Sequence, residues 1–127
     1  MHIGRKAFTL VEILVVIMIV GVLAAIAIQR FGTSKSKAYL TAMKSDLRNL
    51  VTAEAGWFAD SSRYSTDLSV IAFRQSSGVN APSVVTGAGY WSATVTHSKL
   101  TGHTCGVAVN TANPIQTTAG EGEPVCN

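Results

Sequence analysis

The 127-residue sequence lacks the short motifs that mark the common classes of enzyme and nucleotide-binding protein. There is no GxSxG, no Walker loop, no HExxH pair and no dinucleotide fingerprint. There is also no CxxC pair and no cluster of histidines, so nothing in the sequence supports a metal site. We therefore expect a protein that is not an enzyme and that holds neither a cofactor nor a metal ion.

Charge is also scarce. Charged residues make up 13% of the chain, and the formal net charge is +3. Arg5 and Lys6 account for most of that excess, because eight basic and seven acidic side chains remain without them, a net charge of +1. The basic character therefore gives no case for nucleic-acid binding. Few aromatics, with many Thr, Ser, Ala, Gly and Val, suit a small extracytoplasmic domain rich in β-structure.

Only two cysteines are present, Cys105 and Cys126, both late in the chain. In an oxidising compartment they predict one disulfide that closes a loop of about twenty residues, worth about 3 kcal/mol on the loop-entropy model. Two unpaired thiols, or half of a metal site, are the alternatives. A small domain of fewer than about a hundred residues often needs such a covalent link.

What the sequence does have is a long apolar run from Phe8 to Ile28. The run has the length of about twenty residues that a helix needs to cross a hydrocarbon core of about 30 Å. It contains no proline, and Gly21 is its only strong helix weakener. Arg5 and Lys6 precede it, which predicts a cytoplasmic N-terminus and an outward-facing remainder.

One charge, Glu12, interrupts the apolar run. A carboxylate near the centre of a membrane helix costs about 2.5 to 3.5 kcal/mol on insertion scales. Glu12 lies about one turn from the start of the run, which reduces that cost, but it is still a poor choice for an inert anchor. No Lys or Arg lies between Phe8 and Gln29. The cation that Glu12 needs must come from the leader side, from a new N-terminus or from another chain.

The segment Lys6-Ala7-Phe8-Thr9-Leu10-Val11-Glu12, with a basic leader before it and an apolar helix after it, resembles the class III signal of type IV pilins and pseudopilins. The resemblance implies that a membrane peptidase cuts between Ala7 and Phe8 and methylates the new amine of Phe8. It also implies that Glu12 meets the amine of Phe8 of a neighbouring subunit during assembly.

Two positions depart from the usual pattern of that family. Ala7 stands where Gly is usual before the cut, and Gln29 stands where many pilins have Pro. The helix is therefore predicted to run straighter than usual, with any local melting in a filament relying on Gly21. Two other interpretations remain: a secretory signal cleaved near Ala25–Ala27, and a plain single-pass anchor.

A helical period continues beyond the apolar run. Six apolar residues recur at spacings of three and four and form one stripe: Leu40, Met43, Leu47, Leu50, Val51 and Phe58. We predict one helix from about residue 8 to about residue 60, some 80 Å long. The striped half packs on its own domain. The first half is apolar all round, so lipid or other copies of the chain must cover it.

The rest of the chain predicts a loop at residues 60–65, a short helical turn at 66–73, and strands at 83–86, 90–97 and 104–110. Residues 98–102 are expected to form a turn, and the tail to residue 127 a loop. The fold class is therefore α+β, a long N-terminal helix packed by a small antiparallel β-meander. The predicted parts are a leader at 1–7, a transmembrane and assembly segment at 8–30, and a pilin-like globular domain at 31–127.

Other candidate sites are weaker. Cys105 could form a nucleophile pair with a nearby histidine, but a disulfide with Cys126 is its simpler use. His97 and His103 could form a metal site with one acidic residue, but the ligand spacing is lacking. Glu121 and Glu123 could touch a cation, although a solvated tail explains them better. We expect three aromatic residues to pack over the end of the long helix rather than to form a ligand cage: Trp57, Phe58 and Tyr64.

These features predict a structural subunit, a major pilin, of a type IV pilus-like filament that serves adhesion or motility. The precursor would span the inner membrane once, and the mature chain would reach the cell surface. The resemblance implies three partners: the prepilin peptidase, a platform protein with a separate cytoplasmic ATPase, and further copies of the chain. The alternatives are a pseudopilin of a type II secretion system, a DNA-uptake pilus subunit, and a monomeric membrane-anchored binding module.

Overall fold

The computed structural model describes residues 7–127, and the chain divides into two compact units. One unit ends at Lys35, and the other comprises Ser36–Asn127. Of the leader predicted for residues 1–7, only Ala7 falls within the described residues. The basic residues Arg5 and Lys6, and His2, lie outside them.

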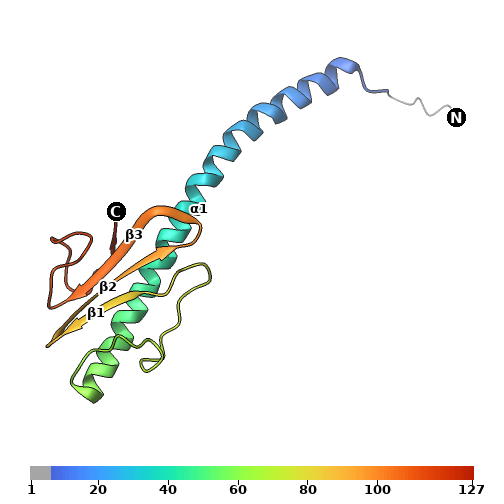
Figure 1. The fold of residues 1–127 in the computed structure, drawn as a ribbon. Coiled ribbons are helices and arrows are strands. Elements are labelled where there is room, and N and C mark those ends of the chain that lie inside the picture. The colour runs from blue at the N-terminus through green and yellow to red at the C-terminus, as the bar shows by residue number, and fades with distance from the viewer. Residues whose placement is uncertain (1–6) are drawn as a thin grey trace. The chain divides into compact units, whose positions relative to one another are not determined.

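A single helix, α1, runs from Leu10 to Ser61 (Figure 1). It confirms the long N-terminal helix that the apolar run and the apolar stripe predict together. Part of it is long and apolar enough to cross a membrane. The helix ends where Ser62 takes a positive φ of 57°, and the N–H of Ser62 bonds to the carbonyl of Phe58 at 2.8 Å. A left-handed residue at this position is a common way to end a helix.

Four strands form one antiparallel sheet in the order β1-β2-β3-β4. Their bounds are β1 Ser83–Gly87, β2 Tyr90–His97, β3 Leu100–Val109 and β4 Val125–Cys126. Sequential neighbours pair throughout, so the predicted meander is confirmed. β2 has the predicted bounds, whereas β3 begins four residues earlier than expected, because the connection from His97 to Leu100 is only two residues long.

The core of the second unit lies between the sheet and the striped face of α1, which run beside each other in Figure 1. Met43, Leu47 and Leu50 have no exposed surface. They belong to one buried cluster with inward-facing sheet residues, chiefly Trp91, Ala93, Val95 and Val107. Alternate residues of β2 point inward, as expected for a strand with one buried face.

Cys105 and Cys126 form a disulfide, which was the main expectation for this pair. They are directly opposite each other where β3 pairs with β4. β4 was missed, because two residues are too few to give an alternating pattern. The tail also depends on buried Asn113, whose side-chain amide donates to the carbonyl of Gly106 at 3.1 Å and to that of Glu123 at 3.3 Å.

The segment predicted as a short helix, residues 66–73, consists of turns instead. The carboxylate of Asp67 accepts hydrogen bonds from the backbone N–H and the hydroxyl of Ser69, at 2.9 and 2.6 Å. Ala72 also takes a positive φ of 53°. Local side-chain bonds of this kind offer the backbone an alternative to helical hydrogen bonds, which explains why the prediction failed.

Two buried carboxylates of α1 fasten this connecting segment to the helix. Asp46 accepts hydrogen bonds from the backbone N–H and from the hydroxyl of Ser76, both at 2.7 Å. Glu54, two turns later, accepts the N–H of Ser65 at 3.0 Å. Thus the two acidic side chains on the buried face of α1 accept hydrogen bonds from backbone N–H groups of the loop that no strand pairs with.

Candidate functional site

The residues that the sequence singles out for processing and assembly lie at the start of α1 and just before it. Ala7 and Phe8 precede the helix and are exposed, Phe8 to 80% of its surface. Thr9 is the last residue before the helix, and Glu12 is the third residue of the helix. The predicted cut therefore lies four residues before the predicted assembly residue, on the N-terminal side of the helix start.

Thr9 and Glu12 bond to each other in both directions. The backbone N–H and the hydroxyl of Thr9 donate to Glu12 Oε2, at 2.8 and 2.9 Å. The backbone N–H of Glu12 donates in return to Thr9 Oγ1 at 3.3 Å. This reciprocal arrangement is a capping box, which satisfies amide groups that have no partner at the start of a helix. It also explains why α1 begins at Leu10, two residues after the predicted start.

The capping box was missed in the sequence, although the Thr-x-x-Glu spacing before an apolar run is its recognised signature. Both bonds from Thr9 go to Oε2, and no residue among 7–127 donates to Oε1 of Glu12. The side chain is thus held in place while one oxygen stays open to solvent. A cation from outside the described chain can approach that oxygen.

The surface behind this turn is apolar and uncovered. No residue between Ala7 and Lys35 is buried in the single chain, and the large exposed side chains there are almost all aliphatic. A contiguous apolar surface of this size marks a membrane or protein contact. Ala25–Ala27, where a secretory signal would be cut, lies inside the continuous helix.

The other predicted sites do not assemble into a chemical centre. His97 is buried, stacks on Tyr39 with ring centroids 4.2 Å apart, and accepts the N–H of Lys99. His103 is exposed and contacts the backbone oxygen of Asn127 instead. Within residues 7–127 no group of three or more His, Cys, Asp or Glu residues is placed to hold a metal ion.

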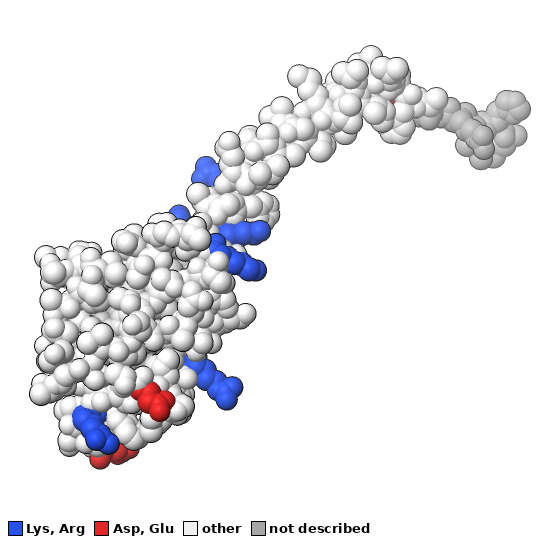
Figure 2. Space-filling view, viewed as in Figure 1, with Lys and Arg blue, Asp and Glu red and all other residues white. Residues whose placement is uncertain are grey.

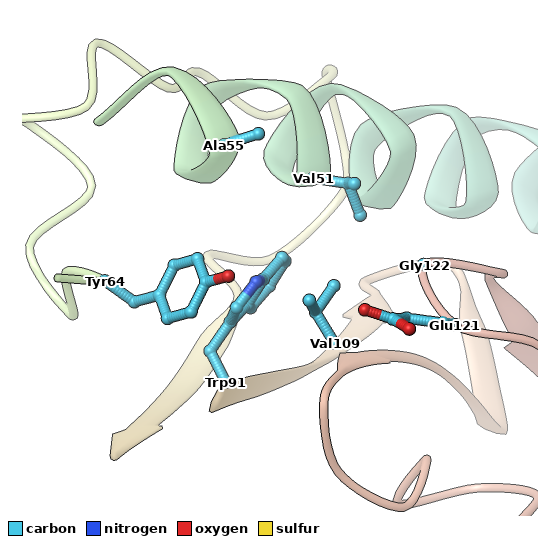
Figure 3. A pocket seen from close by; sticks show the side chains of 7 residues that line it. All are labelled: Val51, Ala55, Tyr64, Trp91, Val109, Glu121 and Gly122. Carbon is cyan, nitrogen blue, oxygen red and sulfur yellow. The ribbon is translucent and has the colours of Figure 1, made fainter. Parts of the chain in front are cut away.

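The aromatic residues near the end of α1 pack on one another. Phe58 stacks on Tyr64, with ring centroids 4.6 Å apart, and Tyr64 lies 6.1 Å from Trp91. Tyr64 and Trp91 lie beside each other along one wall of a cavity (Figure 3). Phe58 and Tyr64 therefore pack at the helix end as expected, and Trp57, the third residue of that expectation, is partly buried and packs against the core cluster.

Glu54 is fully buried, and its Oε1 has no hydrogen-bond partner among the described residues. Burial disfavours the ionised carboxylate and raises its pKa above the usual 4.5, while the hydrogen bond from Ser65 opposes that shift. The folded chain therefore holds this proton more tightly than the unfolded chain does. Stability from Glu54 is present at or below pH 4.5 and is lost as pH rises through the raised pKa.

Glu54→Gln is expected to remove this component of the pH dependence and to leave the protein at least as stable as the native chain at neutral pH. The measurement is the urea midpoint of native and variant proteins between pH 4.5 and 7.5. Asp67→Asn is the control: hydrogen bonds from Ser69 lower the pKa of Asp67, so its contribution is lost only as pH falls through that lowered pKa. Equal pH slopes for the native and Glu54→Gln proteins would contradict the assignment.

Comparisons with known proteins bear on the same N-terminal turn. Residues 4–28 match the family model of the prokaryotic N-terminal methylation motif. The chain is 36% identical over 74 residues to the type IV major pilin protein PilA of Myxococcus xanthus (strain DK1622). The matched stretch is 58% of this chain and 34% of that relative, so the chain spans about a third of the relative's length.

Proposed function

We propose that this chain is a member of the type IV pilin family and a structural subunit of a type IV pilus-like filament, a proposal supported by its methylation motif and its similarity to a major pilin. The observation that carries the proposal is the first half of α1. It exposes apolar side chains all round and places one oriented carboxylate, Glu12, at its start. A helix of that kind is suited first to lipid and then to a bundle of identical helices.

Processing is proposed to begin with hydrolysis of the peptide bond between Ala7 and Phe8, followed by methylation of the new amine of Phe8. Both residues are exposed and precede the helix, so a peptidase can reach them without unwinding α1. The small side chain of Ala7 is compatible with a site that usually takes Gly.

Assembly is proposed to bring the amine of Phe8 of one copy to Glu12 of its neighbour. Thr9 already holds Oε2 of Glu12, and the open Oε1 is available for the incoming ammonium group. In an apolar surrounding such a pair is worth far more than in water, while an unpaired carboxylate there is strongly unfavourable. The pair therefore stabilises a subunit at the one position where its Glu12 meets the Phe8 amine of a neighbour.

The proposed route runs from the inner membrane, where the precursor is a single-pass protein, to a filament on the cell surface. The partners in this route are a prepilin peptidase, an inner-membrane platform protein and other copies of the chain. A separate cytoplasmic ATPase supplies the energy, since the sequence has no nucleotide-binding motif.

The test is electron microscopy of fibres sheared from the producing cells, combined with intact-mass analysis of their subunit. We expect fibres whose subunit has lost residues 1–7, carries one added methyl group at Phe8 and contains the Cys105–Cys126 disulfide. A subunit that starts near Ile28, or a chain that stays alone in the membrane with its leader attached, would overturn the proposal.

A further inference from the structure

A cavity of about 400 Å³ opens between the second half of α1, the sheet and the C-terminal loop (Figure 3). Its walls are mainly apolar and include Val51, Tyr64, Trp91 and Val109. Glu121 is the one charged residue of its lining, and Figure 3 shows the carboxylate directed toward Val109. Apolar walls with one carboxylate fit a long aliphatic side chain that ends in a cation.

The carboxylate of Glu121 has no partner of its own. It is exposed, and among residues 7–127 it forms neither a hydrogen bond nor an ion pair. Its neighbour Glu123 differs, because Glu123 Oε2 accepts the N–H of Gly120 at 2.9 Å and so closes a local turn. The acid at the cavity is therefore the free member of the pair.

A row of cations lies on one face of α1. Lys37, Lys44 and Arg48 are seven and four residues apart, a spacing that places them along a single helix face. None of the three side chains forms an ion pair within the described part of the chain. Lys and Arg side chains stand out along the helix in Figure 2. The same face continues with Val51, which lines the cavity.

The geometry points to a contact between copies in which Lys44 of one subunit enters the cavity of its neighbour and pairs with Glu121. The inference rests on the proposed filament and adds to it a specific contact outside the membrane segment. Lys44 on the helix surface and Glu121 at the cavity are unpaired groups of opposite charge on one chain. When Lys44 of one copy binds Glu121 of the next, each copy still offers its second group to a further copy, so the contact is heterologous and can be repeated along a filament. If two copies packed with their cation rows facing each other, like charges would repel; placing Glu121 opposite Lys44 avoids this repulsion.

Zero-length crosslinking tests the contact directly. Filaments are formed from an equal mixture of ¹⁵N-labelled and unlabelled chains, treated with a carbodiimide that joins carboxylates to amines, and digested for mass spectrometry. We expect a crosslink between the Glu121 peptide and the Lys44 peptide. In half of these crosslinked pairs, one peptide should carry the ¹⁵N label and the other should not. If the two crosslinked peptides always carry the same label, the crosslink lies within one chain and the inference is overturned. It is also overturned if other crosslinks form but no Glu121–Lys44 crosslink is found.

Charge reversal gives an independent readout. Glu121→Lys and Lys44→Glu are each expected to lower filament yield about tenfold, and the double variant is expected to restore most of it. Lys99→Glu is the control, because Lys99 is exposed at the β2–β3 turn, away from the cation row. Thermal unfolding of the purified variants establishes that each is folded.

The outcomes separate this contact from the proposed function itself. If filaments depend on Glu12 but form at full yield with Glu121→Lys, the contact is excluded and the proposed function as a pilus subunit stands. The same conclusion follows if the single variants lower the yield and the double variant does not restore it. A native protein that forms no filaments at all would exclude both.

Discussion

Glu12→Ala is expected to lower the yield of surface filaments by at least about tenfold, while the precursor inserts into the membrane as well as the native chain or better. The substitution removes a carboxylate from the first turn of the membrane helix, where its cost is below the figure of about 2.5 to 3.5 kcal/mol for the helix centre but still unfavourable, so insertion does not suffer. It also removes the carboxylate that we propose as the partner of the incoming Phe8 amine. A loss of 1.4 kcal/mol per added subunit already corresponds to a tenfold change.

Glu12→Gln separates the capping role that the structure shows for this residue from the assembly role that we propose for it. A glutamine oxygen still accepts the N–H and the hydroxyl of Thr9, so the capping box and the start of α1 are retained. The charge is gone, however, and filament yield is expected to fall nearly as far as in Glu12→Ala. Recovery of full yield with Gln would mean that Glu12 acts as a helix cap alone.

The matched control is Asp60→Ala, which removes an exposed acid from the last turn of the same helix. Filament yield, measured by immunoblotting of sheared fibres against the membrane-bound precursor, is expected to be unchanged in this variant. Equal yields for Asp60→Ala and Glu12→Ala would contradict the assembly role and favour a plain anchor.

Trp91→Ala is expected to destabilise the second unit by about 3 to 5 kcal/mol, the usual range for truncating a large buried aromatic residue. Trp91 is 1% exposed, belongs to the main buried cluster and contacts the Tyr64 ring. Small domains have a total stability of about 5 to 15 kcal/mol, so this loss is a large share. Stability is measured by urea unfolding of the full chain in detergent, followed by near-UV circular dichroism.

Tyr90→Ala is the control for this substitution. Tyr90 is the preceding residue of β2 but is 40% exposed and faces away from the core. Its removal is expected to cost less than about 1 kcal/mol, as for most surface substitutions. Similar losses for both variants would mean that the cluster around Trp91 is not the core of the unit.

The large features of the fold were readable because they rest on long, regular patterns. The apolar run before Gln29 and the stripe through Met43, Leu47 and Leu50 together predict α1. β2 alternates clearly and was placed with its observed bounds. The Cys105–Cys126 disulfide could be predicted because the chain has only two cysteines and was expected to lie in an oxidising compartment.

What was missed depends on contacts between residues far apart in the sequence. Nothing local in the chain shows that Asp46 and Ser76, thirty residues apart, form hydrogen bonds with each other. Gly106 is similar: a Cβ there would lie 2.7 Å from Ile115, so the tail can pack on β3 only at a glycine. The Thr9–Glu12 capping box is different, because its Thr-x-x-Glu spacing is local and can be recognised in the sequence.

The central claim is that the first half of α1 is shared among copies of the chain, with Glu12 paired across subunits. A helical reconstruction by cryo-electron microscopy of fibres sheared from native cells tests it most directly. The account predicts residues 8–30 of every copy packed by other copies, with Glu12 Oε1 within hydrogen-bond distance of a neighbour's Phe8 amine. Fibres in which this segment faces solvent, or in which Glu12 meets no amine, would contradict it.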